Sequence, residues 1–117
     1  MKRVLIVDDA AFMRMSIRKM LEENGFEIVG EAENGLMAIE KYQELQPEVV
    51  TMDITMPEMD GLEALRQIKK IDPAASIVMV SALGQEARMK EAIIYGAKGF
   101  IVKPFKEEII VSALAKL

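Results

Sequence analysis

Short apolar runs alternate with longer amphipathic stretches along the whole sequence, and this pattern leaves few folds open. Five of the runs are predicted strands, and four of these are almost wholly apolar and rich in valine and isoleucine. Such runs are typical of strands buried on both faces, as in a parallel sheet. The predicted strands are Val4–Val7, Phe26–Ala32, Val49–Met52, Ile77–Val80 and Phe100–Val102.

The stretches between these runs repeat apolar residues at helical spacing, and all four prolines fall in the gaps between elements. Gly25 stands where the first helix is expected to end, and Asp60 and Glu63 have the spacing of a capping box. The predicted helices are Ala11–Asn24, Gly35–Leu45, Leu62–Ile71, Gln85–Tyr95 and Lys106–Leu117.

A strand followed by a helix, repeated five times, predicts a doubly wound α/β fold with a parallel sheet. We expect one flavodoxin-like (βα)5 domain over residues 1–117, with the strand order 2-1-3-4-5 that is common at this size. The run 26–32 alternates polar and apolar residues and contains Gly30, so it is predicted to be an edge strand.

Composition excludes several classes of site. The chain has no cysteine and no histidine, which removes thiolate metal sites, a cysteine nucleophile and the commonest general base. It contains no apolar run of 18 residues or more and no signal-peptide pattern, so we expect a cytoplasmic protein that does not bind membranes. A net charge of −4 without a basic cluster argues against direct contact with nucleic acid.

Polar residues follow the predicted strands where those strands end. Asp8 and Asp9 follow the first strand, Asp53 the third, Ser81 the fourth and Lys103 the fifth. In an open α/β sheet these ends face the ligand-binding crevice. Taken singly, each residue could be a helix cap, a strand stop or a surface residue. Together they would crowd three carboxylates into one pocket, where like charges destabilise the fold.

A divalent cation would resolve this repulsion. The available ligands are all oxygens, which favours Mg²⁺, Mn²⁺ or Ca²⁺ over zinc or copper. Two or three carboxylates with open positions suit Mg²⁺ best, because this ion keeps waters and takes phosphate oxygens. An aspartate beside Mg²⁺, Lys103 and Ser81 can act as a nucleophile and form an acyl phosphate. The ionised carboxylate needs no general base, which fits the absence of histidine.

The segments VLIVDDA, MDITMPEMDG, SALG and GFIVKPF resemble the signature blocks of response-regulator receiver domains of two-component signalling. The resemblance covers the whole chain, and its spacings are 44 residues from Asp9 to Asp53, 28 to Ser81 and 22 to Lys103. The segment VDDAAFMR and the lack of an extra domain most resemble the stand-alone chemotaxis (CheY-like) type.

The resemblance implies a role for each matching residue. Asp53 would be the phosphoacceptor, and it would bind Mg²⁺ together with Asp9, with Asp8 largely through water and with the backbone carbonyl of Thr55. Lys103 would contact the phosphoryl group, and the Lys103-Pro104 bond is usually cis. Ser81 and Phe100 would form the switch pair, although the chemotaxis relatives usually carry tyrosine at the latter position. Mn²⁺ is expected to substitute for Mg²⁺, and no organic cofactor is expected.

The implied partners are a histidine kinase, a flagellar motor switch protein or another downstream protein, and a phosphatase. The surface for the downstream protein would be formed by residues 85–95, 100–102 and 106–117. We expect a monomer that is not an enzyme in the usual sense, since it would catalyse only its own phosphoryl transfer and dephosphorylation.

Other functions stay open at this point. A phosphorelay intermediate, or the receiver domain of a larger regulator, would share every motif. A flavodoxin-like nucleotide or flavin binder shares the fold class, but the acidic segment DDAAFM would repel a bare phosphate. A phosphatase of the haloacid-dehalogenase type lacks its D-x-D pair around Asp53. A purely structural interaction module leaves the acidic residues unexplained.

Overall fold

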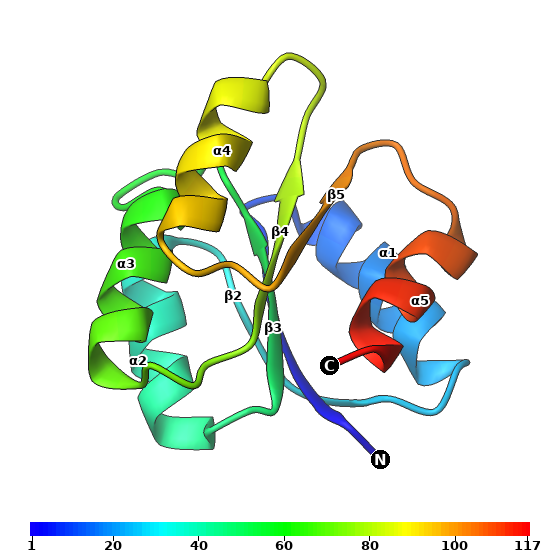
Figure 1. Ribbon diagram of the computed structural model, residues 1–117. Coiled ribbons are helices and arrows are strands. Elements are labelled where there is room, and N and C mark those ends of the chain that lie inside the picture. The colour runs from blue at the N-terminus through cyan, green and yellow to red at the C-terminus, as the bar shows by residue number, and fades with distance from the viewer.

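The computed structural model describes all residues 1–117 and shows a central sheet with helices on both faces (Figure 1). Five parallel strands lie in the order β2-β1-β3-β4-β5, which confirms the predicted fold class and topology. The strands are β1 (Arg3–Val7), β2 (Glu27–Ala32), β3 (Val49–Asp53), β4 (Ile77–Ser81) and β5 (Gly99–Val102). Strand β2 lies at one edge of the sheet, as predicted.

The helices are α1 (Ala11–Glu22), α2 (Gly35–Leu45), α3 (Gly61–Ile71), α4 (Glu86–Ile94) and α5 (Glu107–Ala115). Helices α1 and α5 cover one face of the sheet, and α2, α3 and α4 cover the other (Figure 1). None of the five helices combines the length and the apolar character that a membrane crossing requires.

The core is divided by the sheet into two apolar clusters. On the α2–α3–α4 side, Leu5, Met52 and Met79 pack against Leu65 and other helix residues. On the α1–α5 side, the largest fully buried side chains are Ile6, Ile17, Leu21, Ile110 and Leu114. Alternate residues of β1, β3 and β4 point into the two clusters, which explains why these strands are apolar on both faces.

Several predicted element ends are wrong by one or two residues. The first helix ends at Glu22 rather than Asn24, and Gly25 follows in the left-handed conformation at φ 86°. Phe26 precedes β2, because its N–H bonds to the carbonyl of Leu21 and is not free for the sheet. At α3, Asp60 Oδ1 accepts the N–H of Glu63 at 2.9 Å, as predicted. The other half of the capping box does not form, because the Glu63 carboxylate accepts from Arg66 and Gln67 instead.

Candidate functional site

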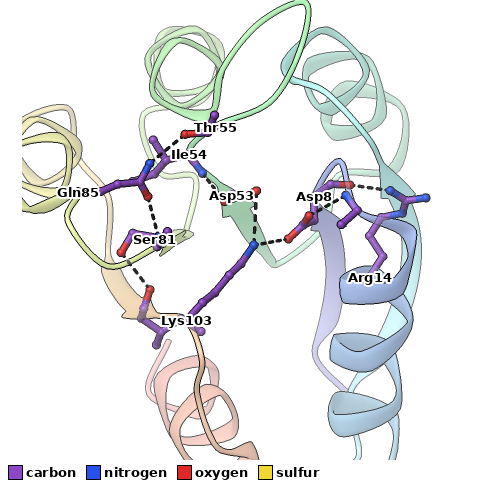
Figure 2. A network of polar contacts seen from close by, with 11 residues as sticks. Asp8, Arg14, Asp53, Ile54, Thr55, Ser81, Gln85 and Lys103 are labelled. Atoms are coloured by element: carbon purple, nitrogen blue, oxygen red, sulfur yellow. Dashed lines mark hydrogen bonds and ion pairs between the residues drawn. The ribbon is translucent and has the colours of Figure 1, made fainter.

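The carboxyl ends of the strands bring the predicted site residues to one edge of the sheet. Asp53 is the last residue of β3, Ser81 is the last of β4, and Asp8 and Lys103 directly follow β1 and β5. The Lys103 ammonium lies between two carboxylates, 3.0 Å from Asp8 Oδ2 and 3.5 Å from Asp53 Oδ2 (Figure 2). Residues from opposite ends of the chain therefore meet at a single charged site.

Three carboxylates form the acidic part of this site. One carboxylate oxygen from each of Asp8, Asp9 and Asp53 lies within 4.8 Å of the other two. Asp8 and Asp53 are buried, and Asp9 is exposed. Lys103 pairs with the two buried carboxylates, and Asp9 forms no ion pair with a basic side chain. The hard oxygen donors and the surplus of negative charge fit a divalent cation such as Mg²⁺.

The charge of Asp53 is poorly compensated by its surroundings. Burial and the charge of Asp8 raise the pKa of Asp53 to about 6, with a smaller contribution from Asp9, while the charge of Lys103 opposes the shift. Burial would lower the pKa of Lys103, but its hydrogen bond to Asp8 and the charge of Asp53 raise it overall. The lysine therefore stays charged, and Asp53 is mostly ionised at neutral pH.

The main chain around Asp53 holds this side chain in place. Asp53 Oδ1 accepts a hydrogen bond from the N–H of Ile54 at 2.9 Å, which leaves Oδ2 toward Lys103. Helix α3 begins very close to the same residue, where a Cβ on Gly61 would collide with the main-chain oxygen of Asp53. Glycine at the end of the MDITMPEMDG segment is therefore required by the packing of α3 against the end of β3.

The remaining predicted residues lie around this centre. Thr55 is exposed in the β3–α3 loop, two residues beyond Asp53. The Ser81 hydroxyl is fully buried, 3.1 Å from Met89 Sδ and 3.5 Å from the carbonyl oxygen of Ile101. It does not cap α4, because Gln85 holds the N-cap position. Phe100 is 45% exposed on β5, and the Lys103-Pro104 bond is cis.

Two residues near the site are not predicted by the sequence patterns. Arg14 on α1 donates to the main-chain oxygen of Asp8 at 2.6 Å and pairs with Glu31 of β2 at 2.9 Å. Gln85 bonds to the loops that follow β3 and β4. The only sequence signal for Arg14 is its position in the first turn of the predicted helix that follows the acidic pair. For Gln85, the only signal is its predicted place at the start of a helix.

Comparison with known proteins gives consistent matches over almost the whole chain. The response regulator receiver domain family matches residues 4–115. The chemotaxis protein CheY of Thermotoga maritima is 59% identical over 116 residues, covering 99% of this chain and 97% of the relative. The chemotaxis protein CheY of Bacillus subtilis is 60% identical over 114 residues, covering 97% of this chain and 95% of the relative.

A solved structure extends the similarity to three dimensions. The crystal structure of the CheX–CheY–BeF3–Mg+2 complex from Borrelia burgdorferi contains a chain that is 38% identical, with a TM-score of 0.94. The match covers 98% of this chain and 87% of that one. The fold, the carboxylates at the ends of the strands and the similarity to these relatives lead to one conclusion. The chain belongs to the response regulator receiver domains and is a CheY-like, phosphorylation-activated signalling protein.

Proposed function

We propose that Asp53 accepts a phosphoryl group from a histidine kinase, with Mg²⁺ held by Asp9 and Asp53, by Asp8 largely through water, and by the main-chain carbonyl of Thr55. The observation that carries this proposal is the placement of the Asp53 carboxylate. Its Oδ2 lies 3.5 Å from the Lys103 ammonium, and one of its oxygens lies within 4.8 Å of one oxygen of Asp8 and one of Asp9. The Lys103 ammonium and the proposed phosphoryl acceptor, Asp53, are thus side by side at the carboxyl end of the sheet.

In the proposed reaction, an oxygen of Asp53 attacks the phosphorus of a phosphohistidine on the kinase. A P–O bond forms as the P–N bond breaks, and the bonding electrons leave with the imidazole nitrogen. Lys103 would stabilise the equatorial oxygens, and Ser81 would donate to the bound phosphoryl group. When bound, Mg²⁺ supplies positive charge that offsets the charge of the phosphoryl oxygens. The chain would act as an enzyme only on itself, in accepting and losing this group.

For the output, we propose that the phosphorylated chain binds a flagellar motor switch protein through α4, β5 and α5. These elements expose the apolar side chains of Ile93, Ile94, Phe100 and Ile109. The relatives named CheY are chemotaxis proteins and are 59% and 60% identical to this chain. We further propose that the protein is cytoplasmic and monomeric, and that a phosphatase limits the signal.

The alternative output is a phosphorelay, in which Asp53 passes its phosphoryl group to a histidine on another protein. A role as the receiver domain of a larger regulator would use the same site. Binding of a motor switch peptide, measured with and without beryllofluoride, separates the first output from these two. Binding that increases with beryllofluoride supports the chemotaxis output. Rapid loss of the phosphoryl group to a histidine phosphotransfer protein, without peptide binding, supports the relay.

The acceptor itself is tested by incubation with acetyl phosphate and Mg²⁺, followed by mass spectrometry of the intact protein. We expect one phosphoryl group on the wild type and none on Asp53→Asn, because the amide is isosteric but not nucleophilic. Asp72→Asn is the matched control, since Asp72 follows α3 at the opposite end of the molecule. Full labelling of Asp53→Asn would show that the acceptor is a different residue.

A further inference from the structure

The side chain of Gln85 connects two loops that border the acidic site. Its Oε1 accepts a hydrogen bond from the main-chain N–H of Ala82 at 2.6 Å, and its Nε2 donates to Thr55 Oγ1 at 2.9 Å (Figure 2). Ala82 is the first residue after β4, and Thr55 lies just beyond the end of β3. Gln85 occupies the N-cap position of α4 but makes no capping hydrogen bond, so its polar groups serve only this bridge.

The main-chain N–H of Ala82, which donates to Gln85, is close to the proposed position of the phosphoryl group. In the sheet Asp53 is paired with Val80, so Ser81 and Ala82 follow directly beside the acceptor. A main-chain N–H next to a hydroxyl is a natural pair of donors for a tetrahedral anion. In the unmodified protein, however, the Ala82 donor is already bonded to a carboxamide oxygen.

We propose that Gln85 is a positioning residue whose carboxamide competes with the phosphoryl group for the Ala82 N–H and holds the β4–α4 loop in its unmodified position. The inference rests on the proposed function, in which Asp53 is the phosphoryl acceptor. The loop itself has little else to hold it, because Ala82, Leu83 and Gly84 are exposed and carry no polar side chain. Gly84, at φ 89°, adds freedom of movement to the same loop.

The hydrogen bond from Gln85 to Thr55 makes the Gln85 carboxamide a stronger competitor for the Ala82 N–H. Because Nε2 is anchored on Thr55, Oε1 is held in front of the Ala82 N–H rather than moving freely in solvent. An incoming anion must break this preformed hydrogen bond before it can use the donor. Net hydrogen-bond contributions of the usual size correspond to roughly a two- to tenfold change in affinity.

The test is a titration of the full chain with beryllofluoride in the presence of saturating Mg²⁺. Gln85→Met has about the same length but has no N–H donor and only a weak sulfur acceptor. We expect it to bind beryllofluoride roughly two- to tenfold more tightly than the wild type. Its affinity for Mg²⁺ alone should be unchanged. Ala87→Met, an exposed and uncharged neighbour in the first turn of α4, is the matched control and should behave like the wild type.

A second readout is the hydrogen exchange of the Ala82 amide, followed by NMR. In the wild type this amide should be protected before and after beryllofluoride is added, because its acceptor changes but is never lost. In Gln85→Met it should exchange freely until beryllofluoride binds. A merely structural role of Gln85 would not produce this pattern.

A double mutant tests whether the two ends of the bridge act together. Thr55→Val should raise the affinity for beryllofluoride by less than Gln85→Met, and the double mutant should match Gln85→Met alone. Equal or weaker binding by Gln85→Met than by the wild type would overturn the inference about Gln85. Failure of the wild type to bind beryllofluoride at all would instead overturn the proposed role of Asp53.

Discussion

At the scale of single residues, the three site carboxylates differ in how their charge is balanced. Asp8 is buried, pairs with Lys103 at 3.0 Å and accepts the N–H of Ala10 at 2.9 Å. Asp53 shares the same lysine at the longer distance of 3.5 Å. Asp9 has no such partner and adds negative charge to the site. Removing Asp9 should therefore relieve repulsion, whereas removing Asp8 would also leave Lys103 without its nearest partner.

The first prediction concerns Asp9→Ala. Without metal this variant should be more stable than the wild type, by less than about 1 kcal/mol because Asp9 is exposed and solvent screens its charge. At about ten times its dissociation constant, Mg²⁺ should stabilise the wild type by about 1.4 kcal/mol through mass action. Asp9→Ala should lose most of this gain. Melting curves with and without Mg²⁺ measure both effects, and equal responses of the two proteins would remove Asp9 from the set of ligands.

At the scale of elements, Arg14 links α1 to the neighbouring edge strand and to the acidic loop. Its guanidinium contacts the main-chain oxygen of Asp8 at 2.6 Å and Glu31 at 2.9 Å. Burial would raise the pKa of Glu31, but hydrogen bonds from Arg18 and Arg14 hold it below its ordinary value. The loop after β1 is therefore anchored by the hydrogen bond from Arg14, whose guanidinium is in turn held by its ion pair with Glu31.

The second prediction is that Arg14→Met weakens Mg²⁺ binding by about tenfold, the usual effect of losing a group that orients metal ligands. Arg18→Met is the matched control. Arg18 pairs with the same Glu31 at 2.8 Å but makes no contact with Asp8. Fluorescence or calorimetric titration with Mg²⁺ measures both variants. Equal losses in the two would mean that the ion pairs, rather than the anchor on Asp8, control the metal site.

The elements and most of the site could be predicted because their signals are local or follow from topology. Apolar runs mark the strands, and the carboxyl ends of parallel strands share one edge, so the sequence alone predicts that Asp53 and Lys103 lie together. Gln85 and Arg14 could not be predicted, because their partners are main-chain atoms, a loop hydroxyl and a carboxylate of a neighbouring strand. The hydrogen bonds of a long polar side chain depend on its rotamer and on the geometry of the loops around it. The periodicity of apolar residues in the sequence predicts neither of these.

The third prediction concerns β5 and the helices beside it. Phe100 is exposed while Ile101 is buried, and the Ser81 hydroxyl sits near Met89 Sδ and the Ile101 carbonyl. If Ser81 is drawn toward a phosphoryl group, it leaves both contacts and opens space beside β5. We therefore expect beryllofluoride to move the Phe100 ring inward. In Ser81→Ala, beryllofluoride should still bind without moving the ring.

The Phe100 ring can be followed by its NMR contacts or by crystal structures with and without beryllofluoride. Phenylalanine has no hydroxyl to satisfy, so its inward state should also be populated to some extent before phosphorylation. A motor switch peptide should then bind measurably to the unmodified protein and more tightly with beryllofluoride. A ring that keeps one rotamer in both states, with unchanged peptide affinity, would contradict this switch.

At the scale of the whole molecule, the parallel sheet concentrates negative charge at one end. All five strands run in the same direction, so their carboxyl ends place Asp8, Asp9 and Asp53 together above two apolar cores. The chain carries a net charge of −4, which adds to the repulsion within the site. Without metal, repulsion among these carboxylates should therefore lower the free energy of unfolding. The size of this effect should depend on whether Asp53 is protonated.

The last prediction gives that dependence a sign and a window. The pKa of Asp53 is raised to about 6 in the folded chain, against about 3.9 for an unfolded aspartate. Between these values the folded state binds more protons than the unfolded state, so metal-free stability should fall as pH rises from about 4 to about 6. The loss should be on the order of 1–3 kcal/mol.

Urea unfolding across this pH range, with EDTA or with Mg²⁺, measures the effect. Other carboxylates also titrate here, so the informative quantity is the difference between the wild type and Asp53→Asn, which has no proton to lose at this position. In EDTA the wild type should become less stable relative to Asp53→Asn as pH rises. Mg²⁺ should remove that difference above about pH 6, because the cation binds the ionised carboxylates of the folded state alone. Parallel pH profiles of the two proteins in EDTA would mean that burial and the neighbouring carboxylates do not destabilise the ionised form of Asp53. That result would contradict the electrostatic argument for a metal at this site.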